Sequence, residues 1–262
     1  MDGTRDVPDA PGASGASGAS GVLDTPDESD ESAVPDVAEV LDARSHEPPR
    51  AVLTDFGGVL TTSVLDSFRA WSTGVGDDPL LLERLFREDT ESSALLVEHE
   101  CGRLGEADFE RGIAARLREK GVSVAPAGLV AAIGAGMRPD EAMLAALGEL
   151  RARGVPVAIV SNALGDDCYQ GYDLDALADT VVISSEIGSR KPGRRIYRTA
   201  CDRLGVEPSD CVMIDDLEHN LRGAERLGIR GLHHIRSEET VRALGQLFGV
   251  DSLAGPGAPG PA

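Results

Sequence analysis

The sequence predicts an α/β fold: a doubly wound parallel sheet with an α-helical cap inserted after its first strand. Two observations predict it. Short apolar runs alternate with helical patterns over residues 155–248, as they do where helices join parallel strands. A further apolar run at residues 51–54 comes far earlier in the chain, and only helical spacing is found between residues 62 and 153.

The first predicted strand delivers a carboxylate to its C-terminal end. Ala51–Thr54 is an apolar run, Asp55 follows it directly, and Gly57 and Gly58 indicate a sharp turn. Ligands of open parallel sheets bind in the crevice outside the carboxyl ends of the strands. Asp55 is therefore predicted to lie where a ligand binds.

Helical patterns fill the stretch after this strand. Each has apolar residues three or four positions apart, as one buried helix face requires. The predicted helices are Ser63–Ser72, Pro79–Phe86, Glu106–Lys120, Pro126–Ile133 and Pro139–Arg153. We assign residues 63–138 to a cap over the carboxyl ends of the strands, and residues 50–62 and 139–250 to the core.

Four further strands and three helices complete the predicted core. The strands are Val155–Val160, Thr180–Ser184, Cys211–Ile214 and a weaker one at Gly228–His233. The helices are Arg194–Leu204, Glu218–Leu227 and Glu238–Phe248. Strands that alternate with helices in this way favour parallel pairing, because each helix carries the chain back along the sheet.

Both ends of the chain differ from its middle. Residues 1–49 contain a Gly-Ala-Ser repeat, no aromatic residue, and twelve acidic residues against two arginines, a net charge of −10. Such a segment cannot bury enough apolar surface to offset the entropy that ordering costs. Residues 251–262 are again rich in Gly, Pro and Ala. We expect both ends to be disordered, the first as a solvated acidic leader rather than an interaction arm.

Charge and composition exclude several classes of function. The chain has a net charge of −20, whereas nucleic-acid binding requires clustered Lys and Arg. No apolar stretch approaches the roughly 18 residues that a membrane span requires, and no secretory signal is recognisable. The four cysteines form no CxxC pair, as expected of reduced thiols. We expect a cytoplasmic protein without nucleic-acid or membrane partners, and the sequence predicts no oligomeric state.

Polar residues follow four of the predicted strands. They are Asp55, Ser161-Asn162, the loop from Ser185 to Lys191, and Asp215-Asp216. In a parallel sheet these ends share one edge, so the three carboxylates meet and repel each other unless a cation lies among them. Oxygen ligands of this kind suit Mg²⁺, which also takes phosphate oxygens and water. The sequence therefore predicts that Mg²⁺ binds among these carboxylates.

The chain's use of lysine points independently to Lys191. The sequence has two lysines, Lys120 and Lys191, against 23 arginines. A lysine directly after Arg190 indicates a site that needs a compact ammonium group rather than a planar guanidinium. We expect this ammonium group near the three carboxylates.

Four short motifs occur in order along the predicted strand ends. They are Asp55-Phe-Gly-Gly-Val, Ile159-Val-Ser-Asn162, Arg190-Lys-Pro192 with Ile196-Tyr197, and Ile214-Asp-Asp-Leu-Glu-His-Asn220, the last in a double-acid form. Together they resemble the haloacid dehalogenase-like (HAD) hydrolase superfamily, in the branch with a helical cap after the first strand (subfamily IA). The resemblance covers residues 50–250 and implies a Rossmann-like core. A weaker likeness to this branch is found at Glu100–Leu104, ahead of Phe109.

The resemblance implies a hydrolase that acts on a small phosphorylated substrate through an aspartyl-phosphate. Asp55 attacks a phosphorus atom, and water then hydrolyses the intermediate. Ser161 holds a phosphate oxygen, with Asn162 contributing through its backbone or its side chain. Lys191 neutralises charge on the nucleophile and on the transferring group.

The resemblance also implies the metal ligands and shows one departure. Mg²⁺ bridges Asp55, the backbone carbonyl of Gly57 and Asp216, with Asp215 as a closer or an outer contributor. Most phosphatases of the superfamily carry a second aspartate, the general acid and base, where this chain has Gly57. General acid–base catalysis contributes about 10²–10⁴-fold. We therefore expect a preference for good leaving groups, as in aryl, anomeric or acyl phosphates.

Several other polar side chains are weaker candidates for chemistry. His99 or Glu100 of the cap could supply the missing proton, but we interpret both as solvated helix-end residues. His219 lies within the fourth motif and is expected on a helix surface. His233 and His234 are adjacent on a strand and point to opposite faces, which argues against a shared metal.

Two alternatives to a phosphatase stay open. Some members of the superfamily are dehalogenases, which use an aspartate nucleophile without a metal and also lack the second aspartate. Asp215 and Asp216 argue against this, since two acids without a cation repel a substrate carboxylate. The other alternative is a catalytically weak module that binds a partner through its cap or acidic leader.

Overall fold

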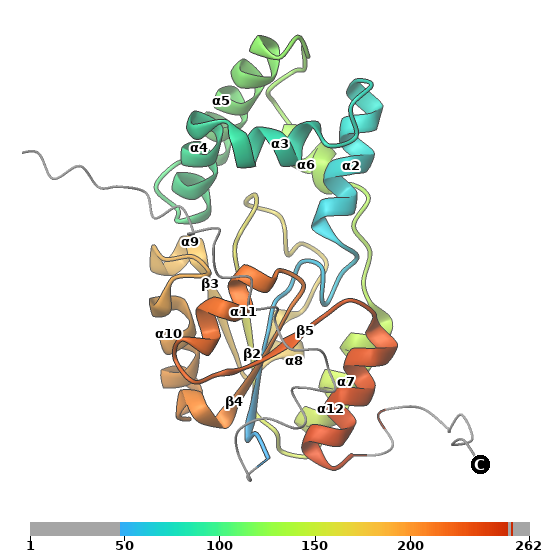
Figure 1. Cartoon of the computed structure of the whole chain (residues 1–262), viewed down its shortest axis with the longest axis vertical. Coiled ribbons are helices and arrows are strands. Elements are labelled where there is room, and N and C mark those ends of the chain that lie inside the picture. Colours follow the sequence, from blue (N-terminus) through green and yellow to red (C-terminus); the bar gives the residue numbers. More distant parts are fainter. Residues whose placement is uncertain (1–47, 251–252, 254–262) are drawn as a thin grey trace, which may run out of the picture. The chain divides into compact units, whose positions relative to one another are not determined.

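The computed structural model describes residues 48–250 and Leu253, and its core is a five-stranded parallel sheet (Figure 1). The strands lie in the order β3-β2-β1-β4-β5, so β1 is central. Their bounds are β1 Ala51–Thr54, β2 Val157–Ser161, β3 Thr180–Ile183, β4 Cys211–Asp215 and β5 Arg230–His233. All four neighbouring pairs are parallel, which brings the carboxyl ends to one edge. The predicted α/β fold is confirmed.

The sheet is buried on both faces. Val52 of the central strand packs in one apolar layer with Met143, and its neighbour Leu53 packs in the other with Ile196. The helices are α7 (Glu141–Ala152) and α12 (Ser237–Phe248) on the first face, and α10 (Arg194–Leu204) and α11 (Glu218–Glu225) on the second (Figure 1). Burial on both faces explains why the strands are continuous apolar runs rather than alternating ones.

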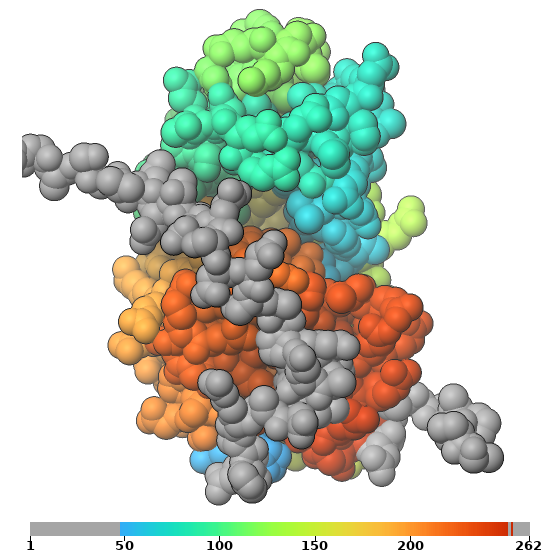
Figure 2. Space-filling model, viewed as in Figure 1, coloured from blue at the N-terminus to red at the C-terminus, as the bar shows by residue number. Residues whose placement is uncertain are grey.

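Five helices separate β1 from α7 and form a block with its own core. They are α2 (Val64–Val75), α3 (Leu81–Glu88), α4 (Thr90–Glu100), α5 (Glu106–Glu119) and α6 (Leu129–Gly134). Phe68, Leu82, Phe109, Ile113 and Leu117 are buried in this core, which we call the cap core. Figure 2 shows the side chains of the block, coloured cyan to green, grouped in the upper part of the view, with the orange and red side chains of α10–α12 in the lower part.

Helix α4 is not among the helices that apolar spacing predicts. Its apolar residues, Ala94 to Val97, are consecutive rather than three or four apart, so no single apolar face is visible in the sequence. The helix is fixed at its start instead. Asp89 caps it by accepting from the Ser92 backbone N–H at 3.0 Å, and Arg116 of α5 contacts the same carboxylate at 2.6 Å. The Arg116 side chain holds the pKa of Asp89 well below its usual range.

Short elements complete the described chain. They are α8 (Leu174–Leu177), α9 (Ser184–Ile187) and a 3₁₀ turn at Pro208–Asp210. All four cysteines are free. Within the described residues, no helix is both long enough and apolar enough to cross a membrane. Apart from Pro48, Pro49 and Leu253, the predicted leader and tail lie outside the described residues, and the assignment of residues 50–62 and 139–250 to a core and 63–138 to a cap stays a prediction.

Candidate active site

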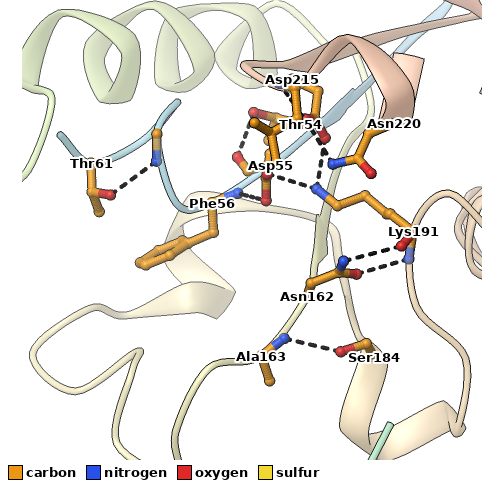
Figure 3. Close-up of polar contacts among 12 residues, drawn as sticks. Thr54, Asp55, Phe56, Thr61, Asn162, Ala163, Ser184, Lys191, Asp215 and Asn220 are labelled. Carbon is orange, nitrogen blue, oxygen red and sulfur yellow. Dashed lines mark hydrogen bonds and ion pairs between the residues drawn. The ribbon is translucent and has the colours of Figure 1, made fainter. Parts of the chain in front are cut away.

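Asp55 lies at the carboxyl end of the central strand, as the sequence predicts (Figure 3). It is 7 % exposed, and its carboxylate accepts the Phe56 backbone N–H at 2.6 Å. Its other oxygen lies 2.7 Å from the Lys191 ammonium nitrogen. Burial raises the pKa of Asp55 to about 8, against the pull of Lys191 and with help from Asp215 and Asp216. The carboxylate is therefore costly to ionise unless more positive charge is nearby.

Lys191 is fully buried and joins two of the three acids. Its Nζ lies 2.7 Å from both Asp55 Oδ2 and Asp215 Oδ2. Burial alone lowers the pKa of Lys191, but Asp215 and Asp55 outweigh it and raise the pKa. The Asn162 side chain holds the lysine backbone from both sides, accepting its N–H at 2.8 Å and donating to its carbonyl at 3.2 Å. Asp55 and Lys191, which come from different motifs, therefore lie in contact at one site.

Asp215 and Asp216 are adjacent in sequence and differ in environment. Asp215 is fully buried and accepts from the Leu217 backbone N–H at 2.9 Å, from Asn220 Nδ2 at 3.0 Å and from Lys191. Asp216 forms no ion pair with any Lys or Arg of the described chain. Burial and the neighbouring Asp215 raise the pKa of Asp216 to about 6.

The three acids form a set of oxygen donors that fits a divalent cation. One carboxylate oxygen from each of Asp55, Asp215 and Asp216 lies within 4.8 Å of the others, and this is the one such cluster among residues 48–250 and Leu253. Gly58 has φ +82° and leaves room for Asp216, because a Cβ at residue 58 would collide with that carboxylate. One lysine does not neutralise three carboxylates, so the cluster is short of positive charge.

These pKa shifts predict that folding stability depends on pH when no divalent cation is present. The pKa values of Asp55 and Asp216 are raised from 3.8 to about 8 and about 6, so the folded state binds protons that the unfolded state releases. Their contribution to stability is full below about pH 4 and is lost as pH rises to about 8. We expect the Tm in EDTA to fall between about pH 5 and 8, and to fall less in Mg²⁺. A Tm that falls equally with and without Mg²⁺ would contradict this.

Five of the predicted site residues line one chamber of about 520 Å³. They are Asp55, Gly57, Asn162, Lys191 and Asp216. Ser161 ends β2 and is 4 % exposed, but neither it nor Asp215 is among the lining residues. The rest of the lining comes largely from the helical block, with Leu217, His219 and Asn220 of the fourth motif.

Gly57 is explained by close packing against the first residue of α2. A Cβ at residue 57 would lie 2.7 Å from Val64 Cγ2. Gly57 is not among the glycines with positive φ, so space and not backbone conformation excludes a side chain. An apolar methyl group thus occupies the region into which an aspartate at residue 57 would project.

We expect Gly57→Asp to lower the free energy of unfolding by about 1–3 kcal/mol, because the β-branched Val64 side chain has few ways to move. Val64→Ala in the same chain should restore part of this loss. Gly74→Asp is the control, since nothing lies within 4 Å of a Cβ at that α2 position. Urea titration measures all three. Equal losses at residues 57 and 74 would refute the packing explanation.

The expectation that His99 and Glu100 are solvated was wrong. They are 6 % and 7 % exposed, because the end of α4 packs against the loop after β2 and against α9. The Ser184 hydroxyl donates to the Glu100 carbonyl at 2.5 Å and accepts the Ala163 N–H at 2.9 Å. The Gly165 backbone N–H donates to His99 Nε2 at 3.1 Å. The sequence could not show this, because the partners lie more than sixty residues away.

The two residues differ as candidate proton donors. His99 Nδ1 lies 2.9 Å from the Leu104 carbonyl, which only accepts, so Nδ1 is the ring nitrogen that donates, and Nε2 accepts from Gly165. Both ring nitrogens are therefore engaged, and His99 does not line the chamber. Glu100 lines it and lies 2.5 Å from Arg190 Nε. Burial raises the pKa of Glu100 to about 7, with Arg190 and Lys191 opposing the rise.

Of the other histidines within residues 48–250, His219 lies on a helix surface as predicted, and His233 ends β5 with His234 directly after it. His219 is exposed on α11, and it also lines the chamber. His233 Nε2 contacts the Asp216 backbone carbonyl at 3.2 Å, and His234 Nδ1 contacts Thr240 Oγ1 at 3.0 Å. Neither belongs to the cluster of possible metal ligands.

Comparisons with known proteins give a family and a fold. A model of the haloacid dehalogenase-like hydrolases matches residues 49–228. The chain is 32% identical over 117 residues to sesquiterpene phosphatase astK of Aspergillus oryzae, which covers 43% of this chain and 59% of that protein. The chain therefore matches only part of the length of that relative.

Solved structures resemble the chain at lower identity. A dehalogenase is similar with a TM-score of 0.55 and 22% identity, covering 73% of this chain and 86% of that one. A HAD family enzyme from Bacteroides thetaiotaomicron, solved with magnesium and inorganic phosphate, has a TM-score of 0.53 and 22% identity, covering 71% and 94%. Likeness at this identity shows the fold alone.

Proposed function

Because the chain belongs to the haloacid dehalogenase-like hydrolases, we propose that it is a Mg²⁺-dependent phosphatase of a small phosphorylated compound. The observation that carries the proposal is the cluster of three carboxylates around buried Lys191, which lacks positive charge and opens on a chamber. A divalent cation and a phosphate group together supply what this cluster lacks. The phosphatase relative and the magnesium–phosphate complex of a structural neighbour agree with it.

Asp55 is proposed as the nucleophile. Its carboxylate oxygen forms a bond to phosphorus while the bond from phosphorus to the leaving oxygen breaks, which gives an aspartyl-phosphate and an alkoxide or phenolate that then takes a proton from water. Water then attacks the phosphorus, and phosphate leaves with the Asp55 carboxylate restored. Lys191, held 2.7 Å from Asp55, offsets the negative charge as the phosphate approaches.

The ends of β2 and of the loop before α10 are proposed to hold the phosphate. The Asn162 side chain is committed to the Lys191 backbone, so its part in binding falls to its own backbone. Ser161 is proposed to bind a phosphate oxygen through its hydroxyl, although it lies outside the chamber lining. Asn162 thus also positions Lys191.

Asp55, Asp216 and the Gly57 carbonyl are proposed to hold Mg²⁺, which when bound offsets charge on the carboxylates and on the phosphate oxygens. Asp215 is already engaged by Lys191, Leu217 and Asn220. We therefore assign Asp215 to positioning Lys191 rather than to a direct bond with the cation.

A dehalogenase is the second candidate, favoured by the absence of an acid at residue 57 and by the fold of the solved dehalogenase. It works without a metal, so the cluster argues against it. A screen of phosphorylated metabolites with Mg²⁺, with Asp55→Asn as the blank, tests the proposed function. Turnover of 2-haloacids in EDTA, with no phosphate released from any compound, would favour the dehalogenase.

The chemistry at Gly57 predicts a steep dependence on the leaving group. Without a carboxyl group at residue 57, the leaving oxygen departs unprotonated unless another group supplies a proton. We expect kcat/KM to fall steadily as the pKa of the leaving alcohol or phenol rises, with alkyl phosphates slowest. Rates along a series of substituted phenyl and alkyl phosphates measure the slope. Equal rates for phenyl and alkyl phosphates would show that a proton donor is present after all.

A further inference from the structure

The helical block gives the chamber an apolar wall, and from it we propose that the substrate is an aryl phosphate, a phosphate monoester of a phenol with an apolar ring system. The proposal rests on the proposed phosphatase function. It selects among aryl, anomeric and acyl phosphates, which the loss of the acid at residue 57 does not distinguish.

The wall combines side chains from three helices and one loop. They are Val64, Leu65 and Phe68 of α2, Phe86 of α3, Leu96 of α4, and Leu164 after β2. All except Phe68 are half-buried, because one side packs against the cap core and the other is left for the chamber. Apolar walls with a few polar groups at one end are typical of sites for apolar ligands. Here the polar end is the cluster of carboxylates with Lys191.

Two phenylalanines of the wall belong to a row of rings. Phe68 and Phe86 lie 5.7 Å apart between ring centres, at 46°, and Phe86 lies 6.4 Å from Phe109 at 11°. The chain is only 3% aromatic and has five phenylalanines, so three in one row are a concentration. Aromatic rings at these spacings favour tilted or offset contacts with another ring. Phe68 and Phe86 are the rings that an aryl group in the chamber would contact.

The charged residues on the cap side of the chamber are already paired. Glu83 lies 2.7 Å from Arg69, Arg87 lies 3.1 Å from Glu88, and Glu100 lies 2.5 Å from Arg190. A sugar would place several hydroxyl groups against the six apolar side chains of the wall, which offer no hydrogen-bond partner, and each hydroxyl group left without one costs binding energy. The wall therefore selects against an anomeric sugar phosphate.

Val64 extends the apolar surface to the proposed reaction centre. Its Cγ2 lies against Gly57, two residues from Asp55. Next to this methyl group a leaving oxygen has no carboxyl group at residue 57 to protonate it. A phenolate delocalises the charge into its ring and can leave without a proton, whereas a plain alkoxide cannot leave readily. The wall and the leaving-group chemistry therefore select the same class of compound.

The first test compares four phosphates on the wild-type protein with Mg²⁺. We expect kcat/KM for 2-naphthyl phosphate to exceed that for phenyl phosphate by about tenfold, since the second ring adds apolar contact. We expect it to exceed that for glucose 1-phosphate by at least about 10³-fold. Acetyl phosphate has a good leaving group and only a small acetyl group to contact the wall, so its rate reports the phosphoryl chemistry alone. Asp55→Asn gives the background for each compound.

The outcomes separate the two proposals. If acetyl phosphate is hydrolysed through Asp55 but glucose 1-phosphate is as good as 2-naphthyl phosphate, the aryl class is wrong and the phosphatase stands. If kcat/KM for 2-naphthyl phosphate does not exceed that for phenyl phosphate, the apolar wall does not contact the ring system of the substrate, and the inference fails. If none of the four is hydrolysed above background, the phosphatase itself is refuted.

The second test asks whether the preference for 2-naphthyl phosphate depends on the wall, and it compares substitutions at two leucines. Leu96 lines the chamber, whereas Leu80, just before α3, is 38% exposed and does not. Leu96→Ser should lower the ratio of kcat/KM for 2-naphthyl phosphate over acetyl phosphate by about tenfold or more. Leu80→Ser should leave the ratio unchanged. An unchanged ratio in Leu96→Ser overturns the inference.

Phe86→Leu serves if Leu96→Ser does not fold, as its Tm would show. It keeps the wall apolar and removes a ring, so it should lower the same ratio by about threefold to tenfold through lost ring contacts. A folded Phe86→Leu protein with the wild-type ratio would overturn the role of the aromatic row. The wild-type comparison of naphthyl and phenyl phosphates needs no variant at all.

Discussion

Asp55→Asn is expected to reduce kcat by about 10³-fold or more, because the amide cannot form the proposed intermediate. The fold should be kept. The amide has nearly the shape of the carboxyl group, and Lys191 keeps its contact with Asp215 at 2.7 Å. In EDTA at about pH 8 the variant should be at least as stable as the wild type, since one of three repelling carboxylates is gone.

Phosphate release and thermal unfolding measure both parts of this result. Asp202→Asn is the matched control, because Asp202 is exposed on α10 and does not line the chamber. It should leave kcat and Tm unchanged. An Asp55→Asn protein that turns over at more than a tenth of the wild-type rate would rule out Asp55 as the nucleophile.

Lys191→Met is expected to have the largest combined effect, on stability and on turnover. It removes the one cationic side chain that the buried carboxylates of Asp55 and Asp215 contact, and leaves both without a positive partner. Removing one partner of a buried ion pair lowers the free energy of unfolding by about 3–5 kcal/mol. Turnover should fall by about 10²-fold or more, because the charge on the transferring group is no longer offset.

The chain offers its own control for this substitution. Lys120 is the other lysine, and it is exposed at the end of α5. Lys120→Met should change the midpoint of urea unfolding little. Excess Mg²⁺ should restore part of the stability of Lys191→Met, since a second cation then faces the same carboxylates. If the two lysine variants unfold at the same urea concentration, Lys191 does not have the role proposed.

The strands were predictable because burial on both faces leaves a direct mark in the sequence. Val157–Ser161 and Cys211–Asp215 are continuous apolar runs that end in polar residues, and both lie within a residue or two of the prediction. Helix α4 has no such mark. Its stability comes from a cap at Asp89 and from Arg116 of another helix, so local spacing could not reveal it.

The site was predictable to the extent that parallel topology determines it. Asp55, Lys191 and Asp216 come from different motifs, and the shared edge of the sheet brings them into one chamber. What the sequence could not give were contacts between side chains distant along the chain. The Glu100–Arg190 pair and the packing of Val64 against Gly57 depend on how the helical block sits on the sheet, which no spacing rule describes.

The proposed function requires that Asp55, Asp215 and Asp216, which share one edge of the sheet, accept a phosphate group only when a divalent cation is bound among them. The most direct measurement is the rate of acetyl phosphate hydrolysis by protein dialysed against EDTA, before and after Mg²⁺ is added, in the wild type and in Asp216→Asn. We expect background rates in EDTA, full recovery with Mg²⁺ in the wild type, and recovery only at much higher Mg²⁺ in the variant. Undiminished hydrolysis in EDTA would contradict the account.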